Sequence, residues 1–122
     1  MLIYLITILF LGSGATPMLA YIGDTQDGVK VVVTEDERRK EALSTLKAMK
    51  KRTTAHNRTV RRARKNIEKE LREDNTSDAD LDTIWAAYFV EFDDYDRDIL
   101  DLRFELKEHI NREEWEAIFP VD

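Results

Sequence analysis

The 122-residue chain contains no cysteine, two histidines, two prolines and four glycines. Without cysteine it can form neither a disulfide nor a thiolate metal site, although this absence indicates no particular redox compartment. Few prolines and glycines mean few marked turns, which favours long helices. The sequence also lacks a glycine-rich phosphate loop, a zinc-protease histidine motif and a nucleophile grouping that a helical fold would assemble. We therefore expect a protein that is not an enzyme and that binds neither a cofactor nor a metal.

One acidic stretch does resemble a metal-binding loop. Asp94, Asp96, Asp98 and Glu105 occupy carboxylate positions of an EF-hand calcium loop. The glycine that such a loop needs for its sharp turn is replaced by Ile99, and helical hydrophobic spacing continues through the segment. We interpret these acids as a solvated helix face.

The N-terminal segment has little charge: no charged side chain precedes Asp24. Its apolar core, residues 2–11, has a length typical of an export signal. The Ser-Gly-Ala sequence at residues 13–15 fits the small-x-small cleavage rule, and the Met-Leu-Ala sequence at residues 18–20 fits it less well. Because no Lys or Arg precedes the apolar run, an uncleaved membrane helix over residues 1–22 and a buried helix of a soluble domain remain open alternatives.

These features divide the chain into three parts. Residues 1–22 are predicted to be a signal peptide or membrane anchor. Residues 23–33 are predicted to be a linker or extended segment, because they end in the β-prone run Val-Lys-Val-Val-Val. Residues 34–122 are predicted to form a helical hairpin domain. This division places the protein outside the cytoplasm, as an exported, periplasmic or secreted protein, or alternatively as a protein anchored by a single membrane pass.

A capping-box pattern, Thr34 with Glu37, predicts the start of a helix that continues without Gly or Pro to about Glu73. Its apolar stripe is weakest at Thr53 and His56, where we expect a core-edge histidine or, alternatively, a pH-responsive packing defect. The stripe comprises Ala42, Leu46, Met49, Thr53, His56, Val60, Ala63, Ile67 and Leu71.

A second cap at Ser77–Asp80 predicts another long helix, with a stronger stripe that ends at Ile110. About four residues separate the two helices, which favours an antiparallel hairpin with coiled-coil-like packing. Asn111 with Glu114 repeats the capping pattern and predicts a short last helix before Pro120. The second stripe comprises Leu81, Ile84, Trp85, Tyr88, Phe92, Tyr95, Ile99, Leu102, Leu106 and Ile110.

Charge is strongly segregated along the chain. Residues 38–69 hold 13 Lys or Arg and two acids, whereas residues 70–122 hold five bases and 18 acids. Opposite the first apolar stripe lies a set of cations that we call the basic face: Lys47, Lys51, Arg58, Arg62, Lys65 and Lys69. It is either a solvated face that complements the acidic helix, or a docking face for an anionic membrane surface or an acidic protein. Nucleic acid is not expected as a partner, because the net charge is -6 and zipper heptads are absent.

Three large apolar residues lie beside the main stripe of the second helix: Phe89, Leu100 and Phe104, which we call the apolar flank. Either the terminal helix covers them, or another protein or a second copy of the chain does, as in a homodimer.

Residues 110–115, Ile-Asn-Arg-Glu-Glu-Trp, are similar to the apolar-Thr-x-x-Gln helix start of the small periplasmic helical-hairpin proteins of envelope stress and metal resistance. Asn111 stands in place of the Thr and Glu114 in place of the Gln, and the similarity covers six of 122 residues. The resemblance implies a chaperone-like or stress- or metal-sensing role.

The sequence thus predicts an all-α protein: a long antiparallel two-helix hairpin plus a short C-terminal helix, preceded by an apolar N-terminal signal or anchor helix. Its predicted role is that of an interaction or adaptor protein at the cell envelope, which makes contacts through the basic face and the apolar flank. The chaperone-like or sensing role and an anionic-lipid-binding role are the alternatives.

Overall fold

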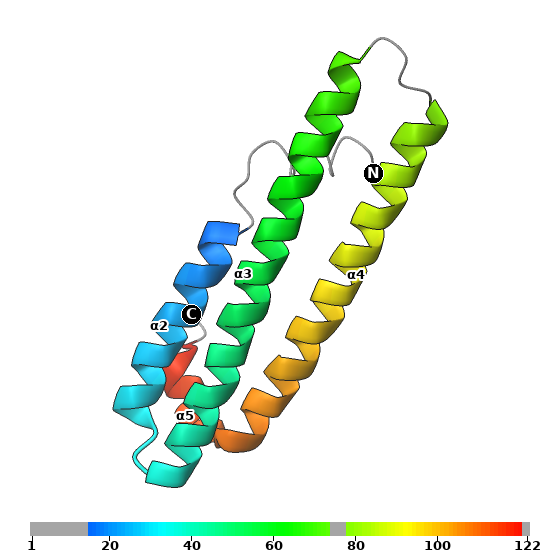
Figure 1. The fold of residues 1–122 in the computed structure, drawn as a ribbon. Helices are drawn as coiled ribbons and strands as arrows, with labels where there is room; N and C mark the ends of the chain where they lie inside the picture. The colour runs from blue at the N-terminus through cyan, green and yellow to red at the C-terminus, as the bar shows by residue number, and fades with distance from the viewer. Residues whose placement is uncertain (1–14, 74–77, 121–122) are drawn as a thin grey trace.

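A computed structural model describes residues 15–73 and 78–120. These residues form four helices and no strand: α2 (Ala15–Val32), α3 (Asp36–Arg72), α4 (Asp78–His109) and α5 (Arg112–Ile118). The long helices α3 and α4 lie side by side, α2 lies along the lower part of α3, and α5 lies near the lower end (Figure 1). The predicted all-α class is confirmed for these residues. The predicted signal or anchor core lies in residues 1–14, outside the described part.

The contacts between α3 and α4 show that the two helices run in opposite directions. Near the lower end, Glu41 of α3 pairs with His109 of α4, with Oε2 and Nδ1 2.9 Å apart. Farther along α3, His56 pairs with Glu91, which lies much earlier on α4. The partner position on α4 therefore falls as the position on α3 rises, which makes the two helices an antiparallel hairpin. Because His109 faces Glu41, the two histidines are far apart along the hairpin.

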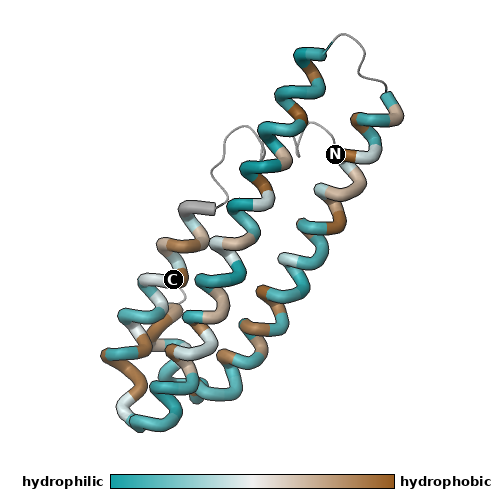
Figure 2. Tube along the Cα trace, viewed as in Figure 1, coloured by the Kyte–Doolittle hydropathy of each residue, from teal (hydrophilic) through white to brown (hydrophobic). Residues whose placement is uncertain are grey.

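The hydrophobic core is divided into two clusters. The lower cluster contains Ile22, Val29, Val33, Ala42, Leu46, Met49, Leu106 and Ile110, with Trp115 and Ile118 packed against it. The upper cluster is smaller: Ile67 and Tyr88 are buried, with Val60, Ala63, Ile84, Trp85 and Phe92 around them. Hydrophilic residues predominate over the part of α3 that continues past α2 (Figure 2). The hairpin alone supplies the upper cluster, whereas α2 and α5 enlarge the lower one.

The extended segment predicted for residues 23–33 is wrong, because α2 continues to Val32. In a helix, residues four apart share a face. Val29 and Val33 are accordingly both buried in the lower cluster, and Val31 between them is 80% exposed. A Cβ on Gly28 would lie 3.2 Å from the Cγ2 of Ile118, so a small residue there allows the close approach of α5. Packing against α3 and α5 overrides the β-propensity of the valines.

Of the three predicted caps, one is confirmed and one is wrong. Asn111 caps α5 by accepting from the Glu114 N–H, and Glu114 accepts from the Asn111 N–H in return. The capping box of Thr34 is wrong, since Glu35 is the N-cap of α3 and makes no side-chain capping bond. The third cap, at Ser77, lies outside the described residues.

α5 is fixed to the start of α3 and to α2. Glu114 is buried and accepts from both terminal nitrogens of Arg38, with Nη1–Oε1 and Nη2–Oε2 distances of 2.5 and 3.2 Å. The hydrogen bond from Arg38 lowers the pKa of Glu114. On the other side, Phe119 stacks on Tyr21 of α2, with ring centroids 5.7 Å apart. The terminal helix therefore packs beside α2, and the predicted alternative in which it covers the apolar flank is wrong.

Two further findings concern the exposure of one residue of the predicted stripe and the apolarity of the helices. Leu71, predicted to belong to the first apolar stripe, is 62% exposed. No helix within residues 15–73 and 78–120 has the length and apolarity needed to cross a membrane.

Candidate docking surfaces

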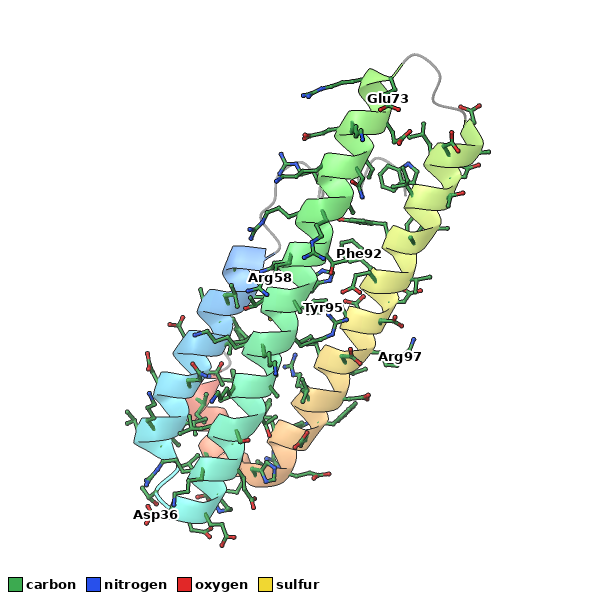
Figure 3. All side chains as sticks on the ribbon, viewed as in Figure 1. Asp36, Arg58, Glu73, Phe92, Tyr95 and Arg97 are labelled. Carbon is green, nitrogen blue, oxygen red and sulfur yellow. The ribbon has the colours of Figure 1, made fainter. Side chains whose placement is uncertain are left out.

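The basic face of α3 is exposed along its whole length. Lys47, Lys51, Arg58, Arg62, Lys65 and Lys69 all lie on the exposed side of the helix. The reason is local: α3 turns Leu46, Met49 and Ile67 toward the other helices, and the cations at helical spacing on the opposite side remain in water. Figure 3 labels one of them, Arg58, on α3.

The cations of the basic face have no acidic partner among the described residues. The arginines of α3 that do form ion pairs are others, namely Arg38, Arg39, Arg52 and Arg64. Four cations near the middle of α3 line one shallow surface depression: Arg58, Arg61, Arg62 and Lys65. Since unpaired like charges on neighbouring helix positions repel one another, this arrangement is unfavourable for the isolated helix.

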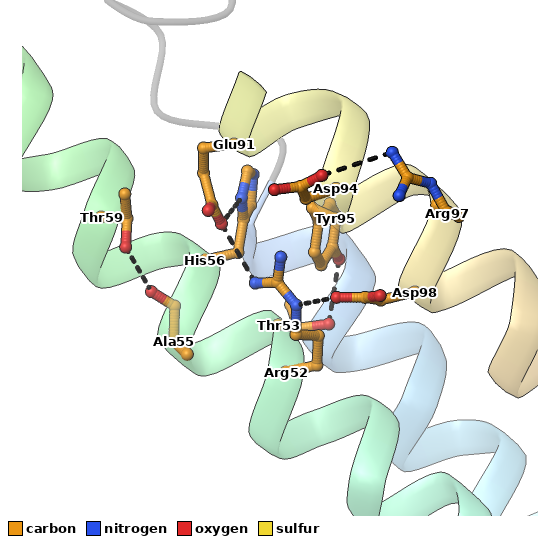
Figure 4. A network of polar contacts seen from close by, with 10 residues as sticks. All are labelled: Arg52, Thr53, Ala55, His56, Thr59, Glu91, Asp94, Tyr95, Arg97 and Asp98. Atoms are coloured by element: carbon orange, nitrogen blue, oxygen red, sulfur yellow. Dashed lines mark hydrogen bonds and ion pairs between the residues drawn. The ribbon is translucent and has the colours of Figure 1, made fainter. Parts of the chain in front are cut away.

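A polar layer separates the two hydrophobic clusters (Figure 4). Arg52 reaches across from α3 and donates to two acids of α4: its Nη1 lies 3.0 Å from Oε1 of Glu91, and its Nε lies 2.7 Å from Oδ2 of Asp98. The hydrogen bond to Asp98 is the main reason why the pKa of Arg52 is raised. Arg52 thus joins the two helices at the position where the apolar stripe is weakest.

Thr53 and His56 complete this layer from α3. The Thr53 hydroxyl is 2.9 Å from the Tyr95 hydroxyl, and both residues are buried. The ring of His56 stacks on that of Tyr95, with centroids 3.9 Å apart, and its Nδ1 lies 3.1 Å from Oε1 of Glu91. Since Glu91 is an acceptor when ionised, His56 Nδ1–H is the donor. His56 is therefore a buried, hydrogen-bonded residue of the interhelical layer.

Burial lowers the pKa of His56 below 6.5, because the charged imidazolium is poorly solvated there, and nearby Arg52 acts in the same direction. Glu91 and, more weakly, Asp96 act the other way. The unfolded chain consequently binds a proton at a higher pH than the folded chain does, so stability falls as the pH is lowered below about 6.5.

We expect the urea midpoint of the protein to fall between pH 7.5 and pH 5.5, and to fall less in a His56→Gln variant. Equilibrium urea unfolding at both pH values measures this difference. Glutamine keeps an amide that can donate to Glu91 and removes the titrating group. An equal fall in both proteins would contradict a role for His56.

The apolar flank of α4 is open to solvent. Phe89 is 39% exposed, Leu100 52% and Phe104 59%. Each belongs to α4, and no described helix packs over them. Acidic residues such as Asp93 and Asp96 are exposed on the same helix, so a partner at this flank would meet apolar rings and negative charge together.

The acids that resemble an EF-hand lie within the continuous helix α4. Asp94, Asp98 and Glu105 lie along one side of this helix over about three turns, and Asp96 lies on another side, so they do not form the closed loop of a calcium site. Within the described residues, no group of three or more histidines and acids is placed to hold a metal ion.

Sequence reasoning identified the exposed cations and the apolar flank, but it missed the interhelical ion pairs of two arginines. The pairs of Arg52 with Glu91 and Asp98, and of Arg38 with Glu114, both depend on a tertiary register that the hydrophobic pattern leaves undefined. The one available signal was the position of Arg52 next to the polar interruption of the stripe at Thr53.

No family model matches the chain, and no curated protein or solved structure shows significant similarity to it.

Proposed function

We propose that this chain is a non-enzymatic, exported or membrane-tethered helical docking protein of the cell envelope. In this proposal the basic face of α3 holds the protein on an anionic membrane surface. The apolar flank of α4 contacts another protein or a second copy of the chain.

The observation that supports this proposal best is the exposure of the basic face to solvent. Its six cations are exposed on one side of a single helix and have no acidic partner among the described residues. Each Lys or Arg held near an anionic membrane contributes about 1 kcal/mol to binding. A face that presents several of them can therefore bind such a membrane although the whole chain has a net charge of -6.

The straight geometry of α3 suits a planar surface. α3 is a continuous helix of 37 residues, Asp36–Arg72, which corresponds to a length of about 55 Å. The basic face extends over most of this length, so its cations can approach one plane together. The acidic helix α4 packs on the opposite, apolar side of α3 and stays away from that plane.

The proposed location outside the cytoplasm depends on the apolar run of residues 2–11, and the start of α2 favours one of the two cleavage sites that follow it. Removal of a signal after Ala15 would leave α2 almost whole, whereas cleavage after Ala20 would remove Met18, which packs against the lower cluster. We therefore expect the mature protein to begin at Thr16. N-terminal sequencing of the protein from fractionated cells measures this, and an intact Met1 in a cytosolic fraction would contradict export.

Vesicle co-sedimentation tests membrane docking. The protein is expected to bind vesicles that contain phosphatidylglycerol, to ignore vesicles of phosphatidylcholine alone, and to dissociate as salt rises, since exposed charges are screened within about 8 Å at physiological ionic strength. Binding that does not depend on lipid charge would contradict the proposal.

The exposed apolar flank also favours a second candidate, a chaperone-like role. The local resemblance at residues 110–115 adds no separate support, because the capping box accounts for Asn111 and Glu114. Suppression of the aggregation of an unfolded client, lost in a Phe89→Ser/Phe104→Ser variant, would favour this role over membrane docking.

A further inference from the structure

The cations of α3 are not evenly spread, since the depression gathers three cations of the basic face together with Arg61. Arg58 and Arg62 are four positions apart, as are Arg61 and Lys65, so the four side chains lie on adjacent turns of one side of the helix. Lys47, Lys51 and Lys69 lie farther along the same face. The four clustered side chains can therefore converge on one small anion, whereas the outlying lysines can only contribute to the general field.

No described acid neutralises this cluster. The neighbouring arginines of α3 have partners: Arg52 binds Glu91 and Asp98, and Arg64 binds Glu68. None of the four cations that line the depression forms such a pair within the described residues. Four positive charges within two turns repel one another, and an anion in the depression would relieve that repulsion.

The side-chain types indicate which anion fits. Three of the four groups are guanidinium groups, each a planar fork that binds phosphate oxygens in pairs, and the fourth is a lysine ammonium. A phosphomonoester has three terminal oxygens and a charge of about -1.5 to -2 at neutral pH. The phosphodiester of phosphatidylglycerol has two free oxygens and a single negative charge, so it uses fewer of the available donors.

We propose that Arg58, Arg61, Arg62 and Lys65 form a binding site for the phosphomonoester headgroup of a membrane lipid. This inference rests on the proposed function, because the outlying cations of the basic face bring α3 to the lipid surface. The depression is open to solvent on the same side as those cations, so a headgroup that projects from the surface can enter it. The site adds headgroup preference to an attraction that depends otherwise on charge alone.

The test compares vesicles of phosphatidylcholine with phosphatidic acid, a phosphomonoester lipid, and vesicles of phosphatidylcholine with phosphatidylglycerol, adjusted to the same zeta potential. The wild-type protein is expected to bind the phosphatidic acid vesicles about tenfold more tightly, as one additional charge-assisted bidentate contact would give. Equal binding to both vesicles would overturn the site but leave the proposed function intact. Binding to neither would overturn both.

Matched variants separate the site from general charge. An Arg58→Gln/Arg62→Gln variant is expected to lose the preference for phosphatidic acid. A Lys47→Gln/Lys51→Gln variant removes the same charge from the same face, and it is expected to weaken binding to both vesicles while keeping their ratio. An Arg58→Lys/Arg62→Lys variant keeps the charge without the guanidinium forks and is expected to lose most of the preference. All six substitutions are at exposed positions, and circular dichroism checks that the helices persist.

Two outcomes would count against the inference directly. Equal loss of preference in the arginine and lysine double glutamine variants would show that charge alone determines it. Tighter binding of soluble glycerol 3-phosphate, measured without vesicles, than of phosphatidic acid in vesicles would indicate a soluble phosphomonoester as the ligand in place of a lipid.

Discussion

Replacement of Val29 by aspartate is expected to lower the free energy of unfolding by about 3 to 5 kcal/mol, or to detach α2 from the hairpin. The Val29 side chain is completely buried in the lower cluster, together with Ile22 and Val33 of the same chain segment. An aspartate there would place a carboxylate among apolar groups that offer it no partner. Urea unfolding measures the global effect, and hydrogen exchange within α2 detects local detachment.

The matched control is Val31→Asp. Val31 is 80% exposed, so this variant is expected to stay within about 0.5 kcal/mol of the wild type. The pair distinguishes a helix from an extended strand, because in a strand Val29, Val31 and Val33 would share one face. Similar destabilisation by both aspartates would contradict α2, as would two neutral substitutions.

The second large effect concerns membrane binding. An Arg58→Gln/Arg62→Gln/Lys65→Gln variant is expected to bind phosphatidylglycerol vesicles roughly 100-fold more weakly, which follows from about 1 kcal/mol for each cation removed. The three positions are exposed, and glutamine keeps good helix propensity, so the fold should be retained. Co-sedimentation over a range of vesicle concentrations measures the change.

A control with the same change of net charge is available away from α3. Arg97, Arg103 and Arg112 are exposed on α4 and α5, and an Arg97→Gln/Arg103→Gln/Arg112→Gln variant is expected to bind nearly as well as the wild type. If both triple variants lost affinity equally, binding would depend on the total charge of the protein, and the basic face would have no special role.

Much of the fold could be predicted from the sequence, because the apolar stripes are long and regular. The hairpin helices begin and end within about two residues of the predicted positions, and Asn111 caps α5 as its pattern indicates. α2 could not be predicted in the same way. Its apolar positions, such as Val29 and Val33, are buried only because neighbouring helices pack against them. A short run of valines taken alone favours a strand.

The exposure of the basic face could also be predicted from the sequence, whereas the polar layer between α3 and α4 could not. Exposure of the basic face follows from the helical period alone, since cations opposite a buried stripe must lie in water. The polar layer around His56 depends on the relative position of α3 and α4, which brings Arg52 onto Glu91 and Asp98. That register is set by side-chain packing between the helices, and the hydrophobic pattern of each helix is compatible with several registers.

The absence of cysteine allows the central proposal to be tested at single positions. Ala55 is exposed on α3, one turn from both Lys51 and Arg58, and Ala87 is exposed on α4. An environment-sensitive fluorophore on an Ala55→Cys variant is expected to shift to the blue when phosphatidylglycerol vesicles are added, whereas the same probe on Ala87→Cys should not respond. A response only at residue 87, or equal responses at both positions, would contradict docking through the basic face of α3.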